Sequence, residues 1–283
     1  MQLWIIFVAL FGLFKGLREP IKKKALERDN LLGVLFIYTL IGFIMVLPTA
    51  HDILNITPLV FLFIIIKSLS VFSAWISAFI SVRKMPVSLY GVIDMSRVLF
   101  STCLGVLFLG EKITVKGSLG LIAVLLGLFL VNRKKNRNDE DVNLKYIWLT
   151  ILSCFLNAIS GTLDKYIMSS GKITSAQLQF WFMLLLTLFY GIFILIKKEK
   201  INLRSCLKNP YIYILSLLLV LGDKMLFIAN SDPASKVTVM TLLKQCSVIV
   251  TVIAGRVIYK EKNTLYKLIC AIIILSGIFI AVI

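Results

Sequence analysis

The chain has 283 residues, of which 59% are hydrophobic and only 16% charged, and its mean hydropathy is +0.94. A soluble domain is closer to half apolar and a quarter charged, so this composition excludes a water-soluble globular protein. The net charge of +17 comes from short lysine and arginine clusters between long apolar runs, a placement that is typical of membrane topology signals and argues against nucleic-acid binding.

Ten apolar runs follow one another, each long enough to cross about 30 Å of hydrocarbon as a helix. All 6 prolines fall at predicted helix ends, where a missing N–H group costs least. The predicted fold class is therefore all-α, a polytopic membrane protein with ten transmembrane helices. We expect the spans at residues 2–20, 32–48, 58–82, 86–109, 114–132, 146–168, 176–196, 209–229, 236–258 and 264–283.

The chain contains an internal repeat, seen most clearly at its two Glu-Lys turns. A shift of 150 residues places Glu111–Thr114 on Glu261–Thr264, and seven of the 22 positions in 111–132 are identical in 261–282. Duplication of one structural unit is the simplest origin of such similarity. Glu111 and Glu261 are each expected to cap the helix that follows.

In the first span, a shift of 145 matches Gly16 and Glu19 with Gly161 and Asp164. An odd number of helices in each unit makes the second unit enter the membrane from the opposite side. The sequence therefore predicts two inverted repeats, with a substrate site between them and transport by alternating access. The predicted parts of this single membrane domain are a first five-helix repeat at 1–132, a basic cytoplasmic linker at 133–145 and a second five-helix repeat at 146–283.

The chain resembles the ten-helix EamA type of the drug/metabolite transporter superfamily along essentially its whole length. The resemblance rests on the duplicated unit and on the helix after Pro86, which ends in Leu109-Gly110-Glu111-Lys112 before a glycine-bearing helix. It implies a transporter whose central cavity is walled by helices 1–4 and 6–9. It says little about substrate, because members move amino acids, sugars, nucleotide sugars, purines, choline or drugs.

Basic residues are distributed unevenly between the two ends of the predicted bundle. About 21 lie near the links after odd-numbered spans and about four near the other links. The positive-inside rule then places both chain ends outside, although members of the family are commonly drawn with both ends in the cytoplasm. Either this chain is inserted the other way, or the basic residues after the first span extend that helix. We expect a multi-pass protein of a bacterial plasma (inner) membrane.

Ionisable side chains within the spans are the candidate functional residues, because each costs several kcal/mol to bury in hydrocarbon. A second group, Lys15, Glu19, Asp164 and Lys165, lies nearer span ends, where long side chains reach the interface, and is assigned a structural role. The mid-span candidates are Lys67, Asp94, Arg97, Asp223, Lys224 and Lys244.

Asp94 and Arg97 are three residues apart on one predicted helix, so they can pair directly. The shift of 150 places Asp94 opposite Lys244. We predict that Asp94 and Lys244 form a gating ion pair or part of the substrate site. The alternative is a static pair that only neutralises two buried charges.

The mid-span set holds more cations than carboxylates, which favours an anionic or zwitterionic cargo such as a carboxylate, an amino acid or a phosphorylated or nucleotide sugar. Lys224 and its neighbour Asp223 point about 100° apart, so they cannot both face one spot. Trp75, Tyr90 and Trp181 are candidate lining residues that could stack on a sugar or ring, with packing or lipid contact as the alternative.

The predicted function is therefore secondary transport, without enzymatic activity and without a cofactor or metal. The chain has no nucleotide-binding loop and no cluster of cysteine and histidine. An exporter of drugs or cationic solutes from the same superfamily and an integral membrane enzyme are the alternatives. Expected partners are a small-molecule substrate, membrane lipid, and either a counter-exchanged solute or a coupling proton on Asp94, Asp164 or Asp223. A homodimer is left open.

Overall fold

The computed structural model describes residues 3–49, 53–110, 115, 118–120, 122–123, 126–127, 143–261 and 264–282. Throughout these residues the regular structure is helical. Six helices are long and apolar enough to cross a membrane, and two shorter apolar helices lie near the C-terminal end. The all-α, polytopic membrane fold predicted from the sequence is confirmed. Most of the predicted fifth span, 114–132, and most of the linker 133–145 lie outside the described residues.

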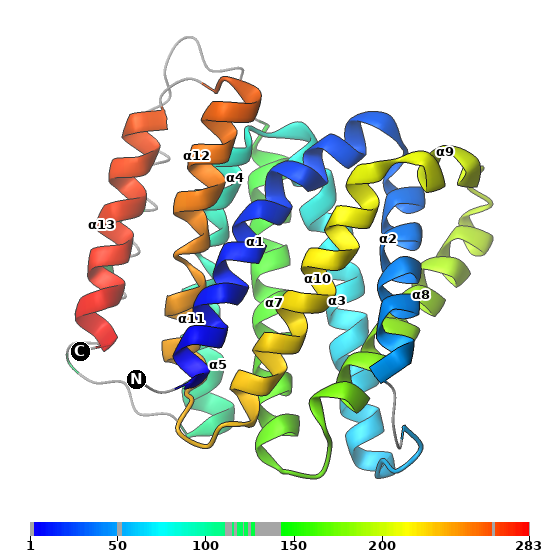
Figure 1. Cartoon of the computed structure of the whole chain (residues 1–283). Helices are drawn as coiled ribbons and strands as arrows, with labels where there is room; N and C mark the ends of the chain where they lie inside the picture. Colours follow the sequence, from blue (N-terminus) through cyan, green and yellow to red (C-terminus); the bar gives the residue numbers. More distant parts are fainter. Residues whose placement is uncertain are drawn as a thin grey trace.

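Figure 1 shows the helices as one upright bundle. In chain order they are α1 (Leu3–Arg28), α2 (Leu31–Val46), the 3₁₀ turn η1 (Leu47–Thr49), α3 (Pro58–Lys84), α4 (Val87–Asp94), α5 (Arg97–Leu109), α7 (Leu144–Ser169), α8 (Ser175–Lys197), α9 (Leu203–Lys208), α10 (Pro210–Ser231), α11 (Val237–Lys244), α12 (Ser247–Tyr259) and α13 (Thr264–Val282).

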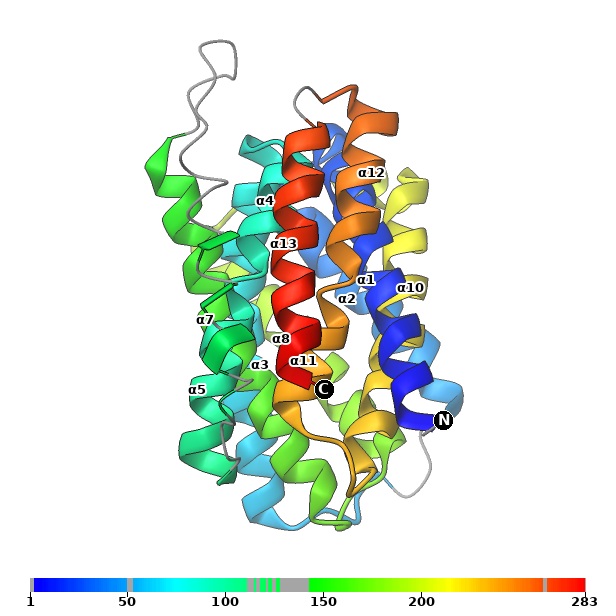
Figure 2. The same ribbon diagram turned by 90° about the vertical axis from the view of Figure 1, so that its left-hand side faces the viewer.

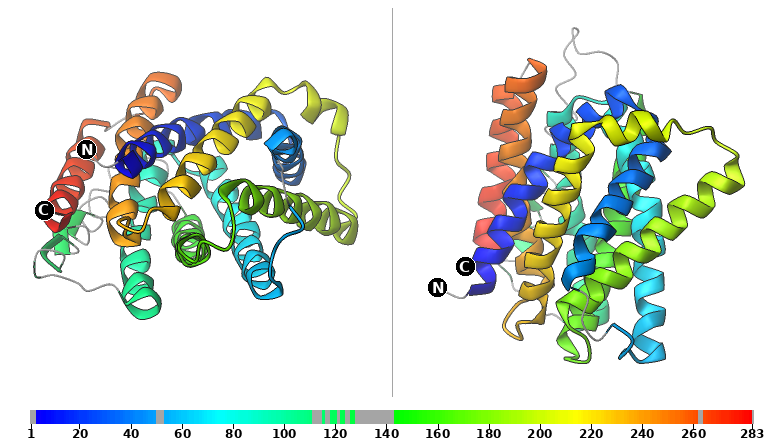
Figure 3. Two further views of the ribbon diagram at one scale, coloured as in Figure 1. Left: turned by 60° about the horizontal axis from the view of Figure 1, so that its bottom comes forward. Right: turned by 45° about the vertical axis from the view of Figure 1, so that its right-hand side comes forward.

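The two halves of the chain interleave in this bundle. Helix α1 packs along α10 and against α11 and α12 of the second half, and α7 packs along α3 and against α4 and α5 of the first half. Seen obliquely from the end that carries both termini, α13 lies at one extreme of the bundle and α8 at the other (Figure 3). Figure 2, which is turned toward that side, shows α13 in front with α12 beside it. The centre is therefore walled by helices of both halves.

The first helices of the two halves run in opposite directions. Near the C-terminal end of α1, Lys23 Nζ donates to the Met85 carbonyl at 2.9 Å. Near the N-terminal end of α7, the Tyr146 carbonyl accepts from Ser81 Oγ at 3.0 Å. Ser81 and Met85 both lie at the C-terminal end of α3, so the end of α1 and the start of α7 lie at the same end of the bundle.

Pro20 lies inside α1, so the prediction that all prolines mark helix ends is wrong at this position. A proline has no N–H group, and the carbonyl four residues earlier, that of Gly16, loses its helical partner. In apolar surroundings this carbonyl needs another donor. The Thr251 hydroxyl on α12 supplies it at 3.3 Å. The basic residues 22–28 therefore extend the first helix, which was one of the two alternatives raised by the charge count.

Two predicted spans, 86–109 and 236–258, are each broken in the middle. The first divides into α4 and α5 at Met95 and Ser96, and the second into α11 and α12 at Gln245 and Cys246. In both breaks the backbone hydrogen bonds tighten to a spacing of three residues, as in Val98 N–H to Met95 and Val248 N–H to Gln245. The two breaks are 150 residues apart, so they occupy equivalent positions of the repeated unit.

Contacts with these breaks show how α1, the first helix of one half, aligns with α7, the first helix of the other. A Cβ atom at Gly12 would lie 3.6 Å from the Lys244 carbonyl at the end of α11. On the other side, Cys154 Sγ lies 3.6 Å from the Asp94 carbonyl at the end of α4. Gly12 and Cys154 thus hold equivalent places, and their numbers differ by 142.

The same difference relates two lysines that bind the loops before the broken helices. Lys23 donates to Met85 in the loop before α4, and Lys165 donates to the Asp232 carbonyl before α11 at 2.8 Å. The predicted shift of 145 for the first helix of each half is therefore wrong by three residues. Only the later helices follow the shift of 150, because the connections between helices differ in length.

Candidate functional site

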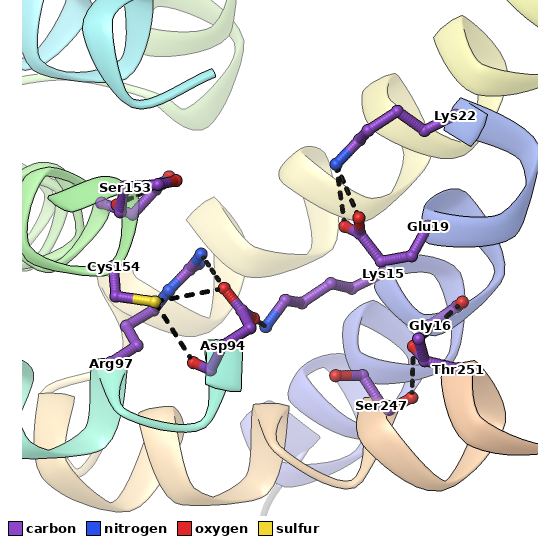
Figure 4. A network of polar contacts seen from close by, with 11 residues as sticks. Lys15, Gly16, Glu19, Lys22, Asp94, Arg97, Ser153, Cys154, Ser247 and Thr251 are labelled. Carbon is purple, nitrogen blue, oxygen red and sulfur yellow. Dashed lines mark hydrogen bonds and ion pairs between the residues drawn. The ribbon is translucent and has the colours of Figure 1, made fainter. Parts of the chain in front are cut away.

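Asp94 is the centre of a buried ionic network at the break between α4 and α5 (Figure 4). It is 4% exposed and ends α4. Lys15 Nζ lies 2.6 Å from its Oδ2 atom, and the guanidinium of Arg97 lies 2.8 Å from Oδ1. The Cys154 thiol of α7 also approaches Oδ1 at 3.5 Å. One carboxylate therefore joins two cations from two different helices.

Lys15 belongs to a stripe along one face of α1. The residues Phe11, Lys15, Arg18 and Lys22 are spaced by four, three and four, which places them on the same side of a helix. Lys22 pairs with Glu19 at 2.8 Å (Figure 4). The stripe faces the bundle interior, and its spacing is the signal in the sequence that could have identified these residues as a group.

A cavity, here called the central cavity, lies between the two halves. It measures about 90 Å³, so this conformation holds a small polar group rather than a drug-sized molecule. Seven helices, α1, α3, α5, α7, α8, α10 and α11, contribute to its wall. It is lined by Phe11, Arg18, Lys67, Val71, Trp75, Arg97, Ser101, Asn157, Ser160, Gly161, Asp164, Phe182, Asp223, Leu226, Phe227 and Lys244.

A second space, here called the α1 cavity, adjoins the central cavity and measures about 50 Å³. The two share Arg18, Trp75, Arg97 and Asn157, so these four residues form the partition between them. The rest of the α1 cavity is lined by Lys15, Glu19, Lys22, Tyr38, Ala78, Phe79 and Tyr90. All three charged residues of the α1 stripe, Lys15, Arg18 and Lys22, therefore line this second space.

Lys67 and Asp164 form a second buried ion pair, between α3 and α7, with 2.5 Å between Nζ and Oδ1. Lys67 is only 1% exposed. Its ammonium group also lies 3.9 Å from the ring centroid of Phe182 and 4.4 Å from that of Phe227. Two aromatic faces and one carboxylate thus hold this cation in an apolar interior.

Aromatic rings accompany the other cations too. Arg18 and Lys244 lie 5.6 and 5.5 Å from the centroid of the Phe11 ring. Lys22 lies 4.8 Å from the centroid of Phe79. A ring face offsets part of the lost hydration of a cation without cancelling its charge. These rings therefore support cations instead of standing free for a planar ligand.

Three charged groups of the central cavity have no opposite charge at ion-pair distance. Within the described part of the chain, Arg18, Asp223 and Lys244 make no salt bridge of 4.0 Å or less. Arg18 instead interacts with the hydroxyl of Tyr38. Unpaired buried charges are costly, so such groups mark the place where a ligand would interact most strongly.

The predicted pair of Asp94 and Lys244 is not present in this conformation. Asp94 is occupied by Lys15 and by Arg97, its predicted neighbour on the same helix. Lys244 faces Phe11 in the central cavity. Lys15, which the sequence placed near a helix end, takes the partner role because α1 packs against α4 and carries its lysine into the interior.

Other candidates are divided between the site and the periphery. Trp75 lines both cavities and Tyr90 lines the α1 cavity. Lys224 is half-buried on α10 and lines neither cavity, whereas its neighbour Asp223 lines the central one. Trp181 is also outside, because its indole N–H donates to the Ile53 carbonyl at 2.8 Å in the connection after η1.

The four residues assigned to span ends have different places. Lys15, Glu19 and Asp164 line the cavities inside the bundle, and their structural role stays a prediction. Lys165 does have a structural contact at the end of α10: its Nζ donates to the carbonyls of Asn230 and Asp232 and to Ser235 Oγ, at 3.1, 2.8 and 2.7 Å. A cation at a helix C-terminus also opposes the helix dipole.

Glu261 caps a helix of the other half. Its carboxylate accepts the backbone N–H groups of Val87 and Ser88 at 2.6 and 3.0 Å, and the Ser88 hydroxyl as well. These groups begin α4 in the first half, and the expected cap of α13 stays a prediction because residues 262 and 263 lie outside the described residues. Lys267 Nζ donates to Ser88 Oγ at 2.8 Å. The capping therefore joins the two halves. Glu111 lies outside the described residues.

A bundle of apolar helices with a charged cavity between two interleaved halves defines a multi-pass membrane transporter. The chain belongs to the EamA-like transporter family, of the drug/metabolite transporter superfamily, whose model matches residues 2–133 and 144–283. A solved structure described only as "Crystal structure of protein" is similar in fold, with a TM-score of 0.69 and 12% identity over 97% of this chain and 96% of that chain. A search of curated proteins finds no significant match.

Proposed function

We propose that the protein is a secondary transporter that moves a small anionic or zwitterionic metabolite by alternating access between two inverted repeats. The observation that carries this proposal is the excess of cations around the cavities. The linings of the two cavities, together with Asp94, which pairs with Lys15, contain six cations and four carboxylates. The cations are Lys15, Arg18, Lys22, Lys67, Arg97 and Lys244, and the carboxylates are Glu19, Asp94, Asp164 and Asp223.

An excess of two positive charges in a space of low dielectric raises the local concentration of anions. Arg18 and Lys244 face the Phe11 ring and have no carboxylate within 4.0 Å in the described part of the chain, so their charge is still available to a ligand. The two broken helices support the transport mechanism, because discontinuous helices near the midplane commonly form the substrate site of transporters with inverted repeats. We place the protein in a bacterial plasma membrane.

Asp223 favours one alternative, an exporter of cationic solutes. It is the central-cavity carboxylate that has no cation within 4.0 Å in the described part of the chain. For the same reason it is the best candidate to carry a coupling proton, with counter-exchange of a second solute as the other mode. Arg18 and Lys244 line the same cavity, so the single charge of Asp223 still leaves the net charge of these three groups positive.

Thermal unfolding of the purified protein against a panel of ligands tests the proposal, because a ligand that binds the folded state raises the melting temperature. The panel contains carboxylates, phosphate monoesters, amino acids and quaternary amines. We expect anionic or zwitterionic compounds to stabilise the protein and then to be taken up by proteoliposomes. Stabilisation by quaternary amines alone would reverse the assignment in favour of the cation exporter.

A further inference from the structure

Two cations of the central cavity share one aromatic ring. Arg18 Cζ and Lys244 Nζ lie 5.6 and 5.5 Å from the Phe11 centroid, so the two charged groups are within about 11 Å of each other. Phe11 and Arg18 lie seven residues apart on the same face of α1, and Lys244 is the last residue of α11. An anion that enters the cavity beside Phe11 therefore meets a cation from each half of the chain.

The charges of Arg18 and Lys244 are not cancelled by the protein. In the part of the chain that the structure describes, neither has a carboxylate within 4.0 Å, whereas Lys67 in the same cavity has Asp164 at 2.5 Å. Asp223 lines the cavity with them but at a greater distance. The cavity thus contains one neutralised cation and two that can interact with a ligand.

The ring that faces both cations lies beside a packing contact between the two halves. One residue after Phe11, a Cβ atom at Gly12 would be 3.6 Å from the Lys244 carbonyl and 3.7 Å from its Cα. At these distances a Cβ atom would make ordinary van der Waals contact, so α1 and the end of α11 are packed against each other here. The place where both cations meet the ring is therefore fixed by backbone packing, and a ligand held there would bridge the two halves.

We propose that Arg18 and Lys244 form a two-cation site for an oxyanion group of the cargo, a carboxylate or a phosphate, with Phe11 as the residue that positions both. The proposal rests on the proposed function and deepens it by naming the group that is recognised. Arginine and lysine together offer a planar fork of donors and a compact charge, which suits an oxyanion. Because the site draws on both halves, its occupation is linked to their relative packing.

The test measures binding by the purified full-length protein with isothermal titration calorimetry. The probes are inorganic phosphate, glycerol phosphate and succinate, so the phosphate and carboxylate versions are measured separately. We expect at least one probe to bind, and both R18Q and K244M to weaken its binding about 10-fold or more, since each removes a charge-assisted interaction. The double variant should lose less than the product of the two single losses, because both cations hold one group.

Matched variants separate a binding role from a folding role. K224M removes a lysine from the adjacent helix face outside both cavities, and should bind the probe like the wild type. R18K and K244R keep the charges and should retain most of the binding even if the neutral variants unfold. F11L should weaken binding and F11Y should restore it, because a tyrosine still offers a ring face.

Two results overturn the inference, and they are distinguishable. Binding of a probe that is equally strong in wild type, R18Q and K244M would show that the oxyanion binds elsewhere, and the proposed transport of anions would stand. A wild-type protein that binds none of the probes but binds a quaternary amine would remove both the two-cation site and the proposed cargo.

Discussion

Lys15 of α1 and Asp94 at the end of α4 form an ion pair 2.6 Å long, deep inside a protein that is otherwise built from apolar helices. Arg97 binds the other oxygen of the same carboxylate. Asp94 is therefore shared, and its two cations differ in origin, one local to the break and one from a distant helix. This arrangement makes the carboxylate more important for stability than either cation.

D94N should destabilise the protein more than K15M. The asparagine leaves two buried cations without a counter-charge, and breaking a buried pair in this way costs about 3–5 kcal/mol. K15M leaves the pair of Arg97 and Asp94 intact, so its cost should be smaller. Thermal unfolding in detergent measures both. A K15M protein less stable than D94N would contradict the shared-carboxylate model, and K15M/D94N should lose less than the two single losses combined.

T251V should destabilise the packing of α1 on α12, because the Gly16 carbonyl that Pro20 leaves free would lose its donor. An unsatisfied buried carbonyl costs about 1–3 kcal/mol. In a P20A background residue 20 regains an N–H group that can bond to Gly16. The cost of T251V, measured by thermal unfolding, should then shrink. An equal cost in both backgrounds would show that Thr251 acts through its second contact, with the Ser247 carbonyl at 3.1 Å.

Alanine at Gly16 and alanine at Gly161 should have opposite effects on stability. A Cβ atom at Gly16 would lie 2.6 Å from the Ser247 carbonyl oxygen and 2.7 Å from Val250 Cβ, so α1 and α12 must separate. Overpacking of this kind costs about 1–3 kcal/mol. At Gly161 nothing lies within 4 Å, and a helix-interior glycine replaced by alanine gains up to about 1 kcal/mol. The melting temperatures of G16A and G161A are the measurement; a loss at both positions would contradict the prediction.

Q245M should stabilise the protein. Gln245 is fully buried at the break between α11 and α12, and neither its amide oxygen nor its amide nitrogen has a partner in the described residues. The equivalent position of the first break is Met95. Removal of an unpaired buried amide should gain about 1–3 kcal/mol in unfolding experiments. M95Q is the mirror control and should lose stability. If Q245M lowers the stability as much as M95Q does, the amide of Gln245 forms hydrogen bonds in the membrane-embedded protein, and the prediction is wrong.

D223N should tighten the binding of an anionic ligand and weaken the binding of an amine, each by several-fold. The reason is electrostatic, because Asp223 lines the same cavity as Arg18 and Lys244. Titration calorimetry with phosphate and with a quaternary amine gives both values. Asp232 lines neither cavity, so D232N is the control. A change of the same sign for both ligands would argue against direct contact with Asp223.

Much of the architecture could be predicted because it depends on local properties. The predicted spans 58–82, 146–168, 176–196 and 209–229 overlap α3, α7, α8 and α10, since a continuous apolar run in lipid has few choices other than a helix. Pro58 and Pro210 do begin helices, as predicted. The prediction failed at Pro20. The Gly16 carbonyl, which this proline leaves without its helical donor, accepts a hydrogen bond from Thr251 on a distant helix, so the helix can continue.

The breaks at residues 95–96 and 245–246 had no local signal strong enough to divide those spans. Neither contains proline or glycine, and both read as continuous apolar helices. Packing against α1 and α7 stabilises them, through Gly12 at one break and Cys154 at the other. Such contacts depend on the register between helices, which a single sequence does not contain.

The sequence by itself determined the solvent of this protein, its helices, its duplicated plan and the surplus of buried positive charge, because these follow from composition and from periodicity along the chain. Only the tertiary structure decided which charge meets which. In the folded bundle Asp94 pairs with Lys15 instead of Lys244, Lys224 lies away from the cavity, and Arg18 lines it. The physical reason is that an ion pair depends on a few ångströms between helices, and that distance is set by packing across the whole bundle.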